Sequence, residues 1–140
     1  MTSSAVERFQ ELLSIMARLR APGGCPWDRE QTFASLRPYI LEETYEILES
    51  IDEGRYADLK EELGDSLLHL VFISQIAQEQ GLFDVAEVIE AINNKLVRRH
   101  PHVFGEVKVE SVGQVLKNWE SIKLGEGDLS EIGSPKTVLG

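Results

Sequence analysis

Two neighbouring segments of this sequence carry apolar residues at helical spacing and are joined only by the short turn DEGR, residues 52–55. Apolar residues that recur every three or four positions indicate an amphipathic helix. A short connection between two helices makes them antiparallel neighbours. The first segment, 32–52, and the second, 56–80, are therefore expected to form a helical hairpin, and this hairpin is the strongest constraint on the fold.

Three further segments also show helical periodicity, namely 5–19, 84–99 with Asp84 as the cap, and a last one that starts at Ser111 or Val112 and ends at Lys123. Glycine and proline separate them, because both residues interrupt helices. No segment alternates apolar and polar residues as a half-buried strand would. The sequence therefore predicts an all-α fold, a helical bundle of about five helices.

The length of 140 residues favours one domain, since domains commonly contain about 100–150 residues. We assign the domain to residues 1–123. The remaining stretch, 124–140, is rich in glycine, serine and acidic residues and is expected to be a flexible tail.

Charge and composition exclude several classes of function. The net charge of −10 argues against nucleic-acid binding, which needs basic surface, although a metal ion can reverse the local sign. The single cysteine, Cys25, cannot form an internal disulfide and suits a reducing compartment. No signal-peptide core is visible, and the most apolar stretch, SLLHLVFISQIA, is too short to cross a bilayer. We expect a cytoplasmic protein that does not bind membranes.

The acidic residues of the hairpin do not follow the pattern of a solvated face. At about 100° per residue, Glu43 falls inside the apolar stripe of the first helix, Glu46 lies on its flank, and Glu42 lies further out. Glu62 and Asp65 share a line on the second helix that continues into apolar residues. Partly buried carboxylates without partners cost several kcal/mol or take up protons, so a bound cation is the simplest remedy.

All-oxygen ligands suit hard ions such as Mg²⁺ or Mn²⁺. A di-iron bundle is the rival, but it uses Glu-x-x-His, and the residues three before the histidines are Ser66, Val97 and Arg99. A magnesium-type site is therefore favoured over iron.

Several quoted segments together resemble the MazG family of nucleoside triphosphate pyrophosphohydrolases. The family signature Glu-Glu-x-x-Glu followed by Glu-x-x-Asp is matched by EETYE, residues 42–46, and ELGD, residues 62–65. The flanking segments GGCPWDREQTF, KLVRRHPHVFG and NWESIK match as well, so the resemblance covers roughly residues 8–123.

The resemblance implies an all-α fold whose four-helix core is completed by dimerisation, in a homodimer or a dimer of dimers. It implies cleavage of a nucleoside triphosphate to monophosphate and pyrophosphate, in nucleotide-pool housekeeping, with Mg²⁺ and with Mn²⁺ as a possible substitute. By motif, the implied metal ligands are Glu43, Glu46, Glu62 and Asp65, the implied catalytic residues are Glu42 and Glu46, and the implied substrate-binding residues are Lys95, Arg99, Trp119 and Lys123.

Other interpretations stay open at this point. Lys95 and Arg99 lie one helical turn apart and suit a departing pyrophosphate, but they also suit an ordinary basic helix C-terminus. Trp119 and Lys123 fit a nucleotide, or a core tryptophan beside a surface lysine. The alternatives in function are a non-catalytic helical module, whose carboxylates bind metal for stability or dock a basic partner, and a pyrophosphatase specific for dUTP or dCTP.

Overall fold

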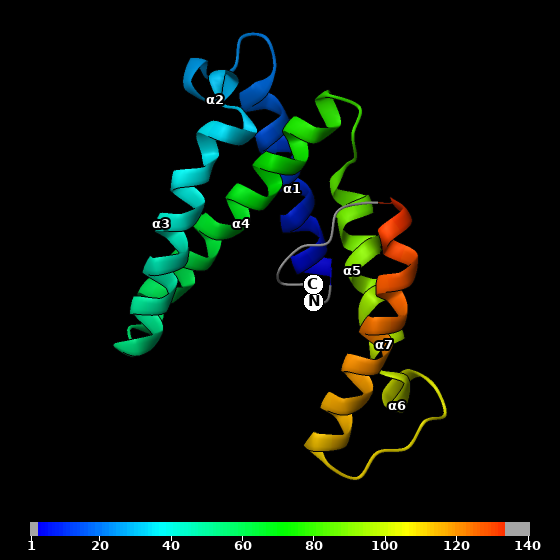
Figure 1. Ribbon diagram of the computed structural model, residues 1–140. Coiled ribbons are helices and arrows are strands. Elements are labelled where there is room, and N and C mark those ends of the chain that lie inside the picture. Colours follow the sequence, from blue (N-terminus) through cyan, green and yellow to red (C-terminus); the bar gives the residue numbers. More distant parts are fainter. Residues whose placement is uncertain (1–2, 134–140) are drawn as a thin grey trace. The chain divides into compact units, whose positions relative to one another are not determined.

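The computed structural model describes residues 3–133, which form helices joined by short loops (Figure 1). The described range contains no strand, and the all-α prediction is confirmed. The helices are α1 Ser3–Arg20, α2 Pro26–Glu30, α3 Phe33–Asp52, α4 Tyr56–Glu79, α5 Val85–Arg99, α6 Pro101–Phe104 and α7 Val112–Gly133.

Two short helices were not expected from the sequence. Pro26 and Pro101 were interpreted as helix breakers, yet each begins a short helix, α2 and α6. Proline is tolerated in the first turn, where its missing N–H would have no helical partner and its fixed φ suits the helix. The expected bundle of about five helices therefore becomes five longer helices with two short ones between them.

The predicted hairpin is formed by α3 and α4, which run side by side (Figure 1). Thr32 starts α3 as expected: its Oγ1 accepts a hydrogen bond from the Ser35 N–H at 3.1 Å, and Ser35 Oγ accepts one from the Thr32 N–H at 2.8 Å. Gly54 adopts a φ of 66° in the connecting turn, a value that favours glycine. The sharp turn places the end of α3 beside the beginning of α4.

The core beside this hairpin brings α1 against α4. Its buried apolar residues are Met16, Leu36, Val71, Phe72 and Ile76. Arg20 closes one end, because its nearly buried guanidinium donates to the carbonyl oxygens of Asp28 and Gln31 and forms an ion pair with Glu79 at 2.6 Å. These contacts fasten the loop that contains α2, so α3 starts from a fixed position.

The chain divides into two compact units, residues 1–88 (unit 1) and 89–140 (unit 2), and each is described by itself. The charges divide unevenly between them. Unit 1 contains 17 acidic and 7 basic residues, whereas unit 2 contains 7 of each, so the formal charge of −10 belongs to unit 1. The acidic character of the chain is therefore a property of the unit that contains the hairpin.

The last helix is longer than expected. The prediction that it ends at Lys123 is wrong, because α7 continues to Gly133 and takes in part of the expected flexible tail. Gly125 and Gly127 weaken helix propensity, which is why the sequence pattern stopped short. The rest of that tail, 134–140, lies outside the described residues. Within the described part of the chain, no helix combines the length and the apolar character needed to cross a membrane.

Candidate metal centre

The inner face of α3 places a carboxylate among buried residues. Leu36, Glu43 and Ser50 are the buried residues of this helix, and they follow one another at intervals of seven, or two turns. Glu43 is only 8% exposed. The prediction that Glu43 lies inside the apolar stripe is confirmed, and a charge at this position needs a partner.

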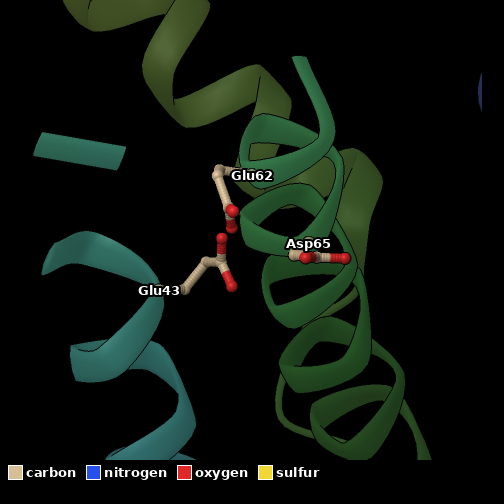
Figure 2. A group of neighbouring side chains, drawn as sticks. All are labelled: Glu43, Glu62 and Asp65. Atoms are coloured by element: carbon tan, nitrogen blue, oxygen red, sulfur yellow. The ribbon is translucent and has the colours of Figure 1, made fainter. Parts of the chain in front are cut away.

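The hairpin brings two further carboxylates to Glu43. Carboxylate oxygens of Glu43, Glu62 and Asp65 all lie within 4.8 Å of one another. Figure 2 shows Glu43 on α3 and Glu62 on α4 with their carboxyl groups pointing toward each other, and Asp65 further along α4. Glu62 and Asp65 are three residues apart and so share a helix face, which makes Glu-x-x-Asp a suitable spacing for one ligand set.

Three glutamates of the hairpin, Glu43, Glu46 and Glu62, have a pKa above that of free glutamate. Burial is the main cause of the raised pKa of Glu43, while the raised pKa of Glu62 comes first from a side-chain hydrogen bond with Glu43. The pKa of Glu46 is raised mainly by a hydrogen bond and charge repulsion from Glu62. Without a cation, each of these carboxyl groups is therefore harder to ionise than free glutamate, and a bound cation would favour the ionised forms.

The same residues fit a small divalent cation. Glu43 Oε1 and Glu62 Oε2 are buried and have no hydrogen-bond partner. An ion that binds oxygens at about 2.1 Å holds two of them at most about 4.2 Å apart, close to the spread found here. Small rotations of the side chains would complete such a site, and the all-oxygen donor set suits Mg²⁺ or Mn²⁺.

The other two glutamates of the signature lie at the rim of the cluster. Glu46 is exposed and reaches the site through its contact with Glu62. Glu42 is also exposed, and its charge acts on Glu46. Glu61, the neighbour of Glu62 on α4, is exposed. The hairpin thus has an inner set of three clustered carboxylates, of which Glu43 is buried, Glu62 is half-buried and Asp65 is exposed, and an outer pair, Glu42 and Glu46.

The predicted substrate-binding residues all belong to unit 2. Arg99 is buried, and its guanidinium lies 5.5 Å from the centre of the Trp119 ring, so the structure brings these two together. Lys95 and Lys123 are half-buried. Because the carboxylates belong to unit 1, it remains a prediction that the two groups serve one site.

Sequence reasoning missed Glu126, which pairs with both Arg98 and Arg99. A signal was available: Trp119, Lys123 and Glu126 follow the spacing of four and three that marks one helix face. The glycines beside Glu126 placed it in the expected tail, and this hid its connection with the helix.

Fold and site together define an all-α protein with a cluster of carboxylates between two antiparallel helices. Residues 31–104 match the family model of the MazG nucleotide pyrophosphohydrolase domain. The chain therefore belongs to the MazG family, as the sequence motifs indicated.

Individual relatives agree with this assignment. The chain is 55% identical over 118 residues to a Thermotoga maritima protein named nucleoside triphosphate pyrophosphohydrolase/pyrophosphatase MazG. This alignment covers 84% of this chain and 45% of the relative. It is 52% identical over 122 residues to the Escherichia coli nucleoside triphosphate pyrophosphohydrolase, covering 86% and 46%. The chain thus spans about half the length of these curated relatives.

A solved structure shares the fold. The crystal structure of a mazG-related protein from Thermotoga maritima superimposes with a TM-score of 0.69 at 29% sequence identity, covering 82% of this chain and 98% of the other.

Proposed function

We propose that this chain hydrolyses nucleoside triphosphates between the α- and β-phosphates, releasing monophosphate and pyrophosphate, with Mg²⁺ or in its place Mn²⁺. The observation that carries the proposal is that Glu43 and Glu62 each have a buried carboxylate oxygen without a partner, and that their carboxyl groups point toward each other across the hairpin. Membership of the MazG family and the names of the relatives support the reaction.

In this proposal the inner carboxylates and Glu46 hold the cation. Bound Mg²⁺ would neutralise phosphate oxygens and make a water more acidic. Glu42 and Glu46 are exposed at the rim, where a carboxylate oxygen can accept the proton of the water that attacks the α-phosphorus.

In the same proposal, basic side chains of unit 2 bind the phosphate chain of the nucleotide. A triphosphate is strongly anionic, and the acidic unit 1 repels it unless metal is bound, whereas unit 2 is neutral overall. Lys95 and Arg99 are assigned to the departing pyrophosphate, and Trp119 and Lys123 to the nucleoside and its phosphates. The contact between Arg99 and Trp119 supports a common role for these two residues.

Pyrophosphate release from a panel of ordinary and modified nucleoside triphosphates tests the reaction. We expect equal amounts of monophosphate and pyrophosphate with Mg²⁺, and none with chelator. The ranking of substrates separates a general enzyme from one that acts on dUTP or dCTP alone. Orthophosphate with a nucleoside diphosphate would place the cut at the wrong bond, and metal binding without turnover would instead identify a non-catalytic module.

The proposed assembly is a homodimer or a dimer of dimers. Exposed apolar residues line both hairpin helices at helical spacing: Leu41, Tyr45 and Leu48 on α3, and Leu63, Leu67 and Leu70 on α4. Such lines support four-helix packing with a second copy. Sedimentation equilibrium should give at least twice the chain mass of 15.7 kDa. A monomer would contradict dimerisation, and these apolar residues would then need another explanation than contact with a second copy.

A further inference from the structure

Unit 2 contains a pair of histidine side chains that the proposed reaction does not use. The ring centres of His100 and His102 lie 5.5 Å apart, and the ring planes are tilted by 50° to each other. Residues two apart on a helix do not face each other. His100, however, precedes α6 with a φ of −123° and a ψ of 59°, outside the helical region. The turn at Pro101 therefore brings together two rings that helix spacing would separate.

The hydrogen bond of His100 fixes which of its ring nitrogens carries the proton. Its Nδ1 lies 2.6 Å from the Leu96 carbonyl oxygen. A carbonyl oxygen only accepts, so Nδ1 is the donor, and in the neutral ring the lone pair is on Nε2. Histidines that bind a metal through one nitrogen are commonly oriented in this way, with the other nitrogen bonded to a backbone carbonyl. His100 thus has the tautomer and the orientation of a metal ligand through Nε2.

His102 contributes a nitrogen that has no hydrogen-bond partner. Its Nδ1 is buried, and a buried polar atom left unpaired costs about 1–3 kcal/mol. The spacing of the two rings indicates what can pair with it. Two imidazoles on one tetrahedral zinc ion, with Zn–N bonds of about 2.0–2.1 Å, have ring centres roughly 5–5.5 Å apart. The distance between His100 and His102 is that of two ligands to one ion.

The donor atoms determine which ions suit this pair. Imidazole nitrogens suit zinc, copper and nickel, whereas Mg²⁺ prefers oxygen ligands. Among the residues that the structure describes, the carboxylate cluster of unit 1 is the only group of three or more potential ligands close enough to share an ion. Water would therefore complete the coordination on the histidine pair. Structural zinc sites are closed by four protein ligands, so a site with two is open and suits an ion that exchanges.

The histidine pair contacts a residue that we assign to the nucleoside. The ring centres of His100 and Trp119 lie 4.9 Å apart, with the planes at 80° to each other. The Arg99 guanidinium lies over the same tryptophan ring. An ion that fixes the His100 ring would therefore also restrict the motion of Trp119.

We propose that His100 and His102 form a second metal site, which binds Zn²⁺ through Nε2 of His100 and Nδ1 of His102. This site belongs to unit 2 and uses nitrogen ligands, whereas the carboxylate cluster belongs to unit 1 and uses oxygen ligands. The bound ion holds His100 against Trp119, so Zn²⁺ regulates unit 2 without taking part in the hydrolysis. The metal site itself does not depend on the proposed function.

Calorimetric titration of the full-length chain with Zn²⁺, in excess Mg²⁺ to occupy the carboxylate cluster, tests the site. We expect the wild-type chain to bind one Zn²⁺ on the histidine pair. His100→Gln and His102→Gln should each weaken this binding at least about tenfold, since even the loss of a residue that only orients a ligand costs about 10–100-fold. His69→Gln is the matched control, because it removes the only other histidine of the chain, and it should bind Zn²⁺ as the wild type does.

Nitrogen NMR of the histidine rings in the wild-type chain identifies the ligand atoms directly. Zn²⁺ should shift Nε2 of His100 and Nδ1 of His102 and leave the ring of His69 unchanged. This measurement decides if circular dichroism shows that a histidine variant does not fold. The proposal is wrong if Zn²⁺ shifts neither nitrogen of the pair, or if both pair variants bind Zn²⁺ as tightly as the wild type. Neither experiment needs turnover, so both can be interpreted even if hydrolysis is not observed.

Discussion

Replacing Glu43 by glutamine is expected to lower metal-dependent turnover by about 10³-fold, the upper range for losing one group that stabilises charge in a transition state. Glu43 is the buried member of the cluster, whereas Glu62 is half-buried and Asp65 is exposed. Glutamine keeps the shape but removes the charge that attracts the cation. Pyrophosphate release at saturating Mg²⁺ measures the loss.

The same variant should be more stable than the wild-type chain when metal is absent. The glutamine amide can donate a hydrogen bond to the Glu62 oxygen that now has no partner, and it removes a buried charge. A gain of about 1–2 kcal/mol in the free energy of unfolding is expected in chelator, as measured by urea denaturation. Stability and activity then change in opposite directions, which is typical of a functional site that carries strain.

Glu61→Gln is the matched control, because Glu61 is an exposed glutamate next to the cluster. It should change neither turnover nor the free energy of unfolding appreciably. Normal turnover in Glu43→Gln would show that the inner carboxylates are not the catalytic metal site. Lower stability of Glu43→Gln in chelator would show that the Glu43 carboxylate has a stabilising partner in solution even without metal.

The inner part of the site could be predicted from the sequence because it depends on local geometry. Helix period alone placed Glu43 in the apolar stripe, and a turn of a few residues fixed which helix faces which. Spacing of three residues then put Glu62 and Asp65 on one face. Each step uses contacts between residues close in sequence, for which helical rules are sufficient.

Features that depend on competing local signals were not predictable in the same way. Proline signals both the end of a helix and its first turn, and the choice at Pro26 and Pro101 depends on where the chain must turn. The glycines beside Glu126 indicated a loop, but this segment is helical, and Glu126 forms an ion pair with Arg99. Tertiary contacts override weak propensity at such positions, and sequence spacing does not report them.

Saturating Mg²⁺ should stabilise the wild-type chain against unfolding, because the unfolded chain has no assembled carboxylate cluster. A ligand at 100 times its dissociation constant adds about 2.7 kcal/mol to the free energy of unfolding. Asp65→Asn should lose most of this increase, since Asp65 is one of the three clustered carboxylates. Glu61→Gln should retain it. Urea denaturation with Mg²⁺ and with chelator gives the difference for each chain.

This measurement separates metal binding from catalysis, which turnover alone cannot do. If Asp65→Asn loses both the stabilisation and the turnover, the cluster binds the metal that the reaction uses. If it keeps the full stabilisation but loses turnover, the ion that stabilises the fold is held elsewhere and Asp65 acts on the substrate or the water. Because the unpartnered oxygens belong to Glu43 and Glu62, the first outcome is the one that the geometry predicts.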